Sequence, residues 1–389
     1  MDFLIPKELR EFRRSLQKLL VKDGLRATAK SFDAHSASKS LALDEKFLNL
    51  WAELSQLGAF LGCLGEDFGG LGFDLVAAQL MLLESARVLS PLPLFETVAL
   101  GIYPLSLMGD ELSRAELLPK IGQGEVRASG AFQDFFGRSN APPLSAKIKE
   151  TRKKKANEER TQYLLSGSAT LVPSVEVVDI ILVPAIIDSC DKALFLVKRE
   201  TFKNLEIIRQ PSFDLVRCYY RLNFKDTEAE LLSTNIVPDA AWQELSDCIA
   251  ILASAEMLGV GQTALDMSVE YAKTRKQFSK PIGSFQAISH KLADMHLELQ
   301  SATTLLHFAA WSRAGDKAQF SQSAAAIKAY ASEIAPKVAE RAIQIHGGIG
   351  FTYEYDLHLF LRRAITLASC YGDKNHHYKR VAELELASS

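Results

Sequence analysis

The sequence predicts an α+β protein of three consecutive parts: an N-terminal α-helical domain over residues 1–125, a middle antiparallel β-domain over 126–235, and a C-terminal four-helix bundle over 236–389. Two changes in the hydrophobic pattern predict this order. Apolar residues recur at three and four positions up to about Lys120 and again after Pro238, whereas short β-branched or apolar runs, separated by Pro, Asp, Lys and Gly, fill the region between. A chain of 389 residues, 48% hydrophobic, is long enough for this division.

Each part has its own local signals. In the first part the segment GEDFGGLGF, residues 65–73, predicts a helix-terminating loop because its glycines break the helical pattern. In the β-domain the segment KIKETRKKKANEER, residues 147–160, is almost wholly charged and predicts a solvated loop or a disordered hairpin tip. In the third part, three long amphipathic runs, 242–275, 285–314 and 323–347, predict the bundle.

The composition excludes several classes of protein. The net charge is −2, so nothing global draws the chain toward nucleic acid or an anionic membrane. The five cysteines are scattered and form no C-x-x-C pair, which favours a reducing cytoplasm over a disulfide framework or a zinc site. We expect no signal peptide and no stretch long and apolar enough to span a bilayer. A small molecule or another protein is the expected partner.

Two stretches are more specific than their surroundings. In EYAKTRKQFSKPIGSFQAISHKLADM, residues 270–295, a helix ends in Arg275, Lys276, Gln277 and Phe278 and restarts near Phe285. A guanidinium, amide donors and an aromatic face at such a turn suit a ligand with phosphates and a ring. In QIHGGIGFTYEYDLHLFLRRA, residues 344–364, paired glycines after a helix let backbone N–H groups approach a phosphate or a flat ring, although a plain helix C-cap explains them as well.

Together these stretches resemble the acyl-CoA dehydrogenase family, whose members carry R-x-Q-F-G-x-P-I…F-Q…A-D-M and Q-x-x-G-G-x-G-F…R segments in this order. The N-terminal run WAELSQLGAF…GEDFGGLGFDLVAAQLMLLESAR is similar to the family's W…L-G…P-E-x-x-G-G…E-x-x-R pattern. The resemblance covers nearly the whole chain, and it implies the same order of helices, β-domain and helices.

The resemblance implies FAD as the cofactor. The family's arginine that grips the FAD diphosphate falls on Arg275, with Gln277 and Phe278 beside it, and Gln286 matches the glutamine of F-Q. The stretch that contacts a neighbouring subunit's cofactor is matched by Gln344, Gly347 and Gly348. FAD would therefore bridge protomers, and a homo- or hetero-oligomer, dimer or tetramer, is implied.

Two departures from the family pattern are visible. Ser279 replaces the usual glycine after Gln-Phe, which affects the turn more than the ligand contacts. In the β-domain the family shows A-x-T-E-P…G-S-D and then G-x-K-x-x-I-T-N, which hold the flavin ring and cover the thioester. The corresponding text here resembles AFQDFFGRSNAPP and LSGSATLVPSVEVVD, without the threonine, the glutamate-proline or the lysine, and with Ser174 as an alternative hydroxyl.

The usual catalytic base is also displaced. The family's base is the glutamate of Y-E-G-T after the RRA helix, and aligning Y-G-D-K, residues 371–374, places Gly372 on it. Asp373 is one residue displaced and one methylene shorter, and the alternative is a helix N-cap or turn aspartate. The pair His376-His377 is expected to be partly exposed near the FAD edge rather than to bind a metal.

Some family members place the base on the first long helix of the bundle, at the position of Ile249 here, which cannot serve. Glu256 lies seven residues further on, on nearly the same helical face, in the apolar run IAILASAEMLGV. Burial is expected to favour its protonated form, as a general base near neutral pH requires. The alternative is a buried ion-pair partner for a neighbouring helix. Asp247 faces the opposite side and ranks below.

The first hypothesis is an FAD-dependent acyl-CoA dehydrogenase that makes an α,β-unsaturated thioester with Glu256 or Asp373 as base, on an atypical acyl-CoA that is ring-bearing or dicarboxylic, as in fatty acid or steroid side-chain degradation. The family normally passes electrons to an electron-transfer flavoprotein. One alternative is a partner subunit of an unlike pair that lacks a complete active site. Others are a flavin oxidase or monooxygenase of the same fold, or a scaffold with a dead site.

Overall fold

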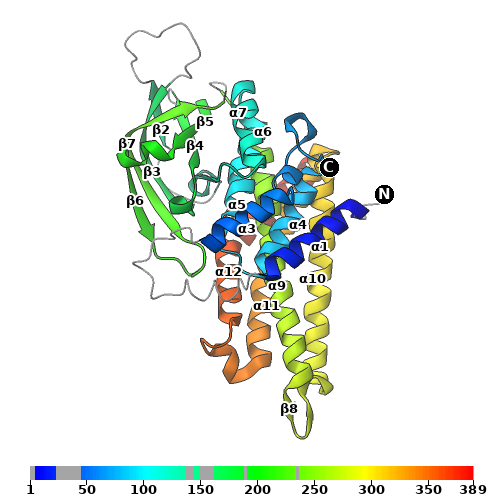
Figure 1. Ribbon diagram of the computed structural model, residues 1–389. Helices are drawn as coiled ribbons and strands as arrows, with labels where there is room; N and C mark the ends of the chain where they lie inside the picture. Colours follow the sequence, from blue (N-terminus) through cyan, green and yellow to red (C-terminus); the bar gives the residue numbers. More distant parts are fainter. Residues whose placement is uncertain are drawn as a thin grey trace.

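The computed structural model describes residues 5–22, 45–136, 144–148, 162–187, 191–233 and 236–388. Helices occupy the two ends of the chain and strands occupy the middle, as the hydrophobic pattern predicts (Figure 1). Residues 149–160 of the charged segment lie outside the described residues, whereas Lys147 and Ile148 end strand β2.

The N-terminal part consists of short helices around α4. Its elements are α1 (Lys7–Lys22), α3 (Glu45–Gln56), η1 (Leu61–Cys63), η2 (Glu66–Phe68), α4 (Asp74–Arg87), α5 (Leu94–Thr97), the π-helical η3 (Val98–Ile102), α6 (Tyr103–Met108) and α7 (Glu111–Gly122). The glycine-rich segment interrupts the helices as predicted, because Gly69 and Gly72 both have positive φ angles, of 77° and 73°.

The middle part is a closed sheet, and the short helices described in it are α8 (Gln133–Phe136), η4 (Val175–Val177) and η5 (Arg199–Asn204). Its strands are β1 (Ala128–Gly130), β2 (Ser145–Ile148), β3 (Gln162–Pro173), β4 (Ile180–Ile187), β5 (Asp191–Lys198), β6 (Leu205–Gln210) and β7 (Tyr219–Leu231). The order β1-β4-β2-β3-β7-β5 closes because β5 also pairs with β4. The predicted antiparallel β-domain is confirmed, with most strand pairs antiparallel, whereas β1 and β2 run parallel to β4.

The C-terminal part is the helical bundle. Its long helices are α9 (Asp239–Thr274), α10 (Gln286–Ser312) and α11 (Lys317–His346), followed by α12 (Leu357–Ser369) and α13 (Lys374–Ser388). A short hairpin, β8 (Lys276–Gln277) with β9 (Lys280–Pro281), joins α9 to α10 at the end of the bundle remote from the sheet (Figure 1). At Gly259 of α9 an added Cβ would lie 2.1 Å from the carbonyl oxygen of Leu83, so this glycine allows α4 to pack closely on α9.

Two large hydrophobic cores hold these parts together, and a smaller cluster of Leu9, Ala77 and Leu80 packs α1 on α4. One core is continuous through the N-terminal helices and the bundle, and the other fills the interior of the closed sheet. Helix α9 runs through the first core. It contains a window long and apolar enough to cross a membrane, with mean hydropathy 1.5, so the prediction that no such stretch exists was wrong. Because 94% of that window is buried inside the protein, α9 is accounted for as a core helix.

Candidate active site and cofactor site

A pocket of about 510 Å³ lies at the remote end of the bundle, where the two motif stretches meet. Arg275, Gln277 and Phe278 line it from the end of α9 and the hairpin, and Ile345 and His346 line it from the end of α11. We call it the bundle-end pocket. Its remaining walls are aromatic or aliphatic: Tyr271, Ile282, Phe285, Ala287 and Ile288. A cation and amide beside flat apolar walls suit a phosphate joined to a planar ring.

The hairpin presents its residues in an uncommon conformation. Phe278 and Ser279 both have positive φ angles, 50° and 65°, which is the pattern of a tight two-residue hairpin turn. Ser279, which occupies the position of the family's glycine, therefore adopts the left-handed backbone conformation that glycine favours. Phe278 is 87% exposed, so its ring is available to a ligand or to another chain.

The glycines after α11 leave open space beside the pocket. Gly347, with a φ of 63°, and Gly348 have no atom of the described chain within 4 Å of where a Cβ would stand. A ligand can therefore approach this backbone closely. Gln344 is exposed on α11 beside Ile345, and Gln286 is exposed at the start of α10 between two pocket residues. Neither glutamine lines the pocket itself, so their predicted roles in cofactor binding remain predictions.

The candidate base Glu256 lies in the interior, where it is held by an arginine. Its two carboxylate oxygens accept hydrogen bonds from the Nη1 and Nη2 atoms of Arg217 at 2.9 and 2.8 Å. Arg217 lies in the loop before β7, and its Nε atom forms an ion pair with Glu96 of α5 at 2.9 Å. We call Glu96, Arg217 and Glu256 the interior triad; the side chains of all three are at most 6% exposed.

The interior triad changes what Glu256 can do. Sequence reasoning considered only its apolar surroundings, whereas the bidentate guanidinium stabilises the ionised carboxylate and occupies both oxygens. The alternative of a buried ion pair is therefore the one that the contacts favour, with a partner from the β-domain rather than from a neighbouring helix. A role for Glu256 in proton transfer stays untested.

Glu96 is the carboxylate that sequence reasoning missed. It is 1% exposed and accepts a hydrogen bond from the Ser174 hydroxyl at 3.0 Å, while its buried Oε2 atom has no hydrogen-bond partner among the described residues. Burial raises its pKa, with Arg217 acting in the opposite direction. The available signal was the same as for Glu256: a single acid in an apolar run, LFETVALGI. Ser174, predicted as an alternative hydroxyl, binds this acid instead of facing a ligand.

The candidate base Asp373 caps a helix. Its Oδ1 atom accepts a hydrogen bond from the backbone N–H of His376 at 2.8 Å, at the start of α13. The preceding residue, Gly372, has a φ of 88°, and an added Cβ would lie 2.7 Å from the imidazoles of both His376 and His377. The position of the family's glutamate is therefore one that only glycine fits here.

Three further contacts hold the same turn. The backbone N–H of Tyr371 donates to the Gln133 side chain at 2.9 Å, and the ring of His377 donates from Nε2 to the Tyr371 carbonyl at 3.0 Å. Lys328, fully buried on α11, donates to the Gly372 carbonyl at 2.9 Å, and burial lowers its pKa to about 8. His377 is 1% exposed, so the expectation that both histidines of the pair are partly exposed was wrong for His377.

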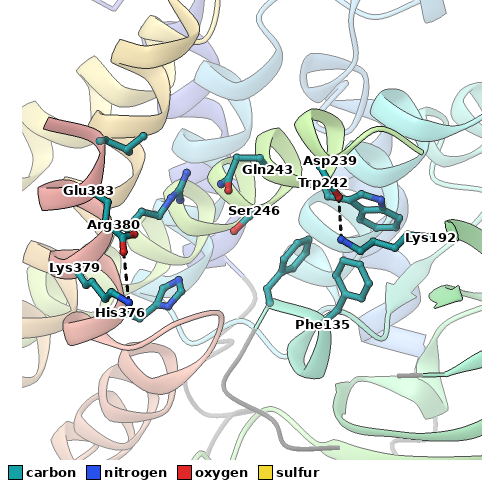
Figure 2. A pocket seen from close by; sticks show the side chains of 12 residues that line it. Phe135, Lys192, Asp239, Trp242, Gln243, Ser246, His376, Lys379, Arg380 and Glu383 are labelled. Atoms are coloured by element: carbon teal, nitrogen blue, oxygen red, sulfur yellow. Dashed lines mark hydrogen bonds and ion pairs between the residues drawn. The ribbon is translucent and has the colours of Figure 1, made fainter. Parts of the chain in front are cut away.

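A cleft of about 610 Å³ lies between α8, the start of α9 and α13 (Figure 2). Phe135, Phe136 and Trp242 give it an aromatic wall, and Lys192, Lys379 and Arg380 give it three cations. Each cation already has an acidic neighbour. Lys192 pairs with Asp239 at 2.9 Å, Lys379 with Glu383 at 3.4 Å, and Arg380 with Asp247 at 2.5 Å.

A closed sheet between two helical parts carries two pockets in which cations lie beside aromatic walls, and such walls suit a ligand that contains phosphates and a planar ring. Residues 6–125 match the acyl-CoA dehydrogenase N-terminal domain, and residues 249–385 match the acyl-CoA dehydrogenase C-terminal domain. The chain belongs to the acyl-CoA dehydrogenase family, and the resemblance expected from its motifs is confirmed. It is thus an oxidoreductase that acts on acyl-CoA.

Curated relatives and solved structures agree with this family. The chain is 28% identical over 339 residues to acyl-CoA dehydrogenase IpdE2 of Mycolicibacterium smegmatis, covering 86% of each chain. It is 29% identical over 356 residues to benzylmalonyl-CoA dehydrogenase of Aromatoleum aromaticum, covering 86% of this chain and 89% of that one. A solved variant of the steroid ACAD Tcur3481-Tcur3483 aligns with a TM-score of 0.81 and 25% identity, covering 98% of this chain and 99% of that one.

FAD is the cofactor of this family, so that expectation is confirmed, and the bundle-end pocket fits one end of it. The open space beside Gly347 and Gly348 gives room for a ligand, and Arg275 and Gln277 give the pocket a guanidinium and an amide. The region expected to hold the flavin ring suits a ligand less well, because the Ser174 hydroxyl donates to Glu96, and Glu96 is also ion-paired with the buried Arg217. Members of the family form oligomers, which agrees with the general expectation of an oligomer.

Proposed function

We propose that this chain is one subunit of an FAD-dependent acyl-CoA dehydrogenase built from two unlike chains. It grips the adenosine diphosphate end of a cofactor whose flavin ring lies against the partner chain, and it lacks a working base of its own. The interior triad is the observation that carries this proposal. A general base must come within hydrogen-bond reach of the proton it removes, and both oxygens of Glu256 are occupied by Arg217 in the interior.

The turn at residues 371–373 supports the same conclusion. Gly372 cannot carry a longer side chain without contact with the two histidine rings, and Asp373 uses one carboxylate oxygen to begin α13. Both positions expected to hold a base are therefore committed to other contacts. The proton would be removed by a carboxylate of the partner subunit, and the similarity to the steroid ACAD Tcur3481-Tcur3483 supports an arrangement of two unlike chains.

This chain's own contribution would be binding and orientation. Arg275 would pair with the diphosphate, and the aromatic walls of the bundle-end pocket would stack on the ring at that end of the cofactor. When bound, FAD supplies the acceptor for the hydride that leaves the β carbon of the acyl group. Preorganised contacts from this chain would fix the cofactor so that the ring meets substrate in one geometry.

The cleft of Figure 2 suits the CoA part of a thioester only weakly. Its aromatic wall can stack on a purine and its cations can meet phosphates, but Lys192 and Lys379 already pair with Asp239 and Glu383. Phosphates would have to displace these carboxylates. We therefore expect productive acyl-CoA binding on the partner chain. The substrate class that we propose is a ring-bearing or dicarboxylic acyl-CoA, and the relative named for benzylmalonyl-CoA supports it.

Co-purification of the tagged full-length chain from its native host tests the proposal. We expect a second, different acyl-CoA dehydrogenase chain in equal amount and a yellow complex that a suitable acyl-CoA bleaches under anaerobic conditions. The chain expressed alone should not be reduced by acyl-CoA. A yellow homo-oligomer of this chain that acyl-CoA reduces would refute the proposal, and a flavin that only NAD(P)H or oxygen chemistry affects would indicate a monooxygenase.

The two acids provide a second test within the active complex. Glu256→Gln keeps a hydrogen-bonding side chain against Arg217, and Asp373→Asn keeps a helix cap, so both variants should fold. We expect turnover within about twofold of the parent complex for both. A loss of a hundredfold or more in kcat for either variant, with unchanged flavin content, would identify that residue as the base.

A further inference from the structure

A further pocket lies in the N-terminal part of the chain, between η1, the glycine-rich segment and helix α7. Its volume is about 610 Å³, which is within the range of pockets that hold small organic molecules. It shares no lining residue with the bundle-end pocket or with the cleft of Figure 2. We call it the N-terminal pocket.

Both walls of the N-terminal pocket are fixed by contacts within the chain. In the glycine-rich segment the backbone N–H of Gly70 donates to the Gly65 carbonyl at 3.1 Å, and an added Cβ at Gly70 would lie 2.1 Å from the Leu64 carbonyl oxygen. The end of α7 is held by Trp51, whose Nε1 atom donates to the Gly124 carbonyl at 2.8 Å. The pocket is therefore preformed, and a ligand would order little of the chain on binding.

Arg114 is the cation of this pocket, and it has no acidic partner. Its guanidinium carbon lies over the ring of Phe68, 5.6 Å from the centroid. Glu111, three positions earlier on the same face of α7, is placed for an ion pair, yet no ion pair or hydrogen bond joins the Arg114 side chain to another of the described residues. Its donors therefore stay unpaired within the described chain. Four other half-buried arginines each pair with a carboxylate: Arg13, Arg87, Arg127 and Arg313.

Two carboxylates line the same pocket. Asp67 and Glu111 are both exposed, and neither forms an ion pair with another residue that the structure describes. The pocket thus has one positive and two negative charges. A phosphate or another anion would meet the two carboxylates, and a simple amine would meet the guanidinium of Arg114. A zwitterion can place each of its charges beside the opposite one.

The spacing of the charges limits the ligand further. Side chains three positions apart on a helix are about 5–6 Å apart at Cβ, so Glu111 and Arg114 can meet two groups that lie only a few ångströms from each other. The ammonium and carboxylate groups of an α-amino acid are bonded to one carbon and meet this condition. The other walls offer apolar surface to an amino-acid side chain: Leu61, Phe68, Ala115 and Pro119.

We propose that the N-terminal pocket is a second ligand site, which binds a zwitterionic α-amino acid with an apolar or aromatic side chain. Arg114 pairs with the carboxylate of the ligand, Asp67 and Glu111 receive its ammonium group, and the apolar walls hold its side chain. This inference goes beyond the proposed function and does not depend on it, because none of these residues belongs to the cofactor or acyl-CoA sites considered above.

Calorimetric titration of the purified full-length chain with L-phenylalanine tests the proposal. We expect a dissociation constant on the order of 1 mM, as for a ligand of this size. 3-Phenylpropanoate lacks the ammonium group and 2-phenylethylamine lacks the carboxylate, so each should bind at least about tenfold more weakly. Arg10→Met, at an exposed position on α1, is the control and should leave all three affinities unchanged.

Two charge variants make the test specific. In Arg114→Met the amine should become a better ligand than L-phenylalanine, because the carboxylate loses its partner and the two acids remain. In Asp67→Asn, Glu111→Gln the order should change in the opposite way, with 3-phenylpropanoate as the better ligand. Neither variant changes a buried side chain, so both should fold.

Three results would overturn the proposal. They are no binding of L-phenylalanine at about 10 mM, binding that Arg114→Met leaves unchanged, and an analogue that binds the parent chain as tightly as L-phenylalanine does. The proposed function would stand in each case, since flavin content and the co-purified partner chain are measured separately.

Discussion

Replacing Arg217 by methionine tests the interior triad most directly. The guanidinium makes two hydrogen bonds to Glu256 and one ion pair with Glu96, and it lies over the ring of Phe95 with its carbon 5.2 Å from the centroid. Methionine fills much of the same volume without a charge, so the change isolates the electrostatic part. It leaves two carboxylates facing each other in the interior without a cation.

The expected cost is large because the partners stay behind. Breaking a buried ion pair by removing one member destabilises by about 3–5 kcal/mol, since the remaining charge is buried and unpaired. Neutralising all three members is a different change. In Glu96→Gln, Arg217→Met, Glu256→Gln no buried charge remains, and we expect the free energy of unfolding to return to within about 1–2 kcal/mol of the parent chain.

Equilibrium urea unfolding at fixed protein concentration measures these differences. Arg221→Met, at an exposed position on β7, is the matched control and should change the free energy of unfolding by no more than about 0.5 kcal/mol. A loss below about 1 kcal/mol in Arg217→Met, or a triple variant no more stable than the single one, would refute the idea that Arg217 compensates both acids.

The pH dependence gives an independent check with a definite sign. Burial raises the pKa of Glu96 already in the parent chain, and removing Arg217 removes the main factor that opposes this. A carboxyl whose folded-state pKa is raised binds more protons in the folded than in the unfolded state. Its contribution to stability is then fully present below the unfolded pKa of about 4.3 and is lost as the pH rises through the folded pKa. The deficit of Arg217→Met should therefore shrink from pH 8 to pH 5.

Three further predictions concern single residues. Ser279→Gly should raise the free energy of unfolding by about 1 kcal/mol, because Ser279 has a φ of 65° that glycine adopts without strain. Urea unfolding measures this change, and Ser284→Gly, at a residue whose φ is not positive, is the control. Gly372→Glu should lower soluble yield and confer no dehydrogenase activity on the chain alone, since its Cβ would lie 2.7 Å from two imidazoles, and new activity would contradict this. Burial lowers the pKa of Lys328 from 10.5 to about 8. The stability that the neutral amine contributes is therefore fully present above pH 10.5 and is lost as the pH falls through 8. Relative to Lys328→Met, the free energy of unfolding of the parent chain should rise by on the order of 3 kcal/mol between pH 8 and 10.5.

The helices and the order of domains follow from the sequence because their signals are local. A period of three to four residues extends over all of α9, α10 and α11, and Gly347 ends α11. The parallel pairing of β1 and β2 with β4 could not be predicted in this way. Strand direction depends on which segments meet in space, and a short run such as Ala128–Gly130 carries no information on its partner.

The candidate site also contains one feature with a local sequence signal and one that depends on contacts between distant residues. The bundle-end pocket was predictable, because Arg275 and Phe278 sit in a motif whose spacing is fixed by one tight turn. The interior triad was not, since Glu96 and Arg217 are 121 positions apart and Arg217 and Glu256 are 39 apart. Nothing within the run around Glu256 indicates a cation from another domain.

The interior triad joins all three parts of the chain through one side chain. Glu96 belongs to the N-terminal helices, Arg217 to the β-domain and Glu256 to the bundle, so a single guanidinium fixes their relative positions. An apolar cluster of similar volume would be about as stable, so stability alone does not account for buried charges here. A working dehydrogenase needs the same interior open to a thioester and its carboxylate free of a permanent cation. Glu256 therefore cannot both hold the three parts together through Arg217 and act as the base that removes a proton. A pair of unlike chains resolves the conflict, because one chain can hold the cofactor rigidly while the other keeps its interior open for substrate.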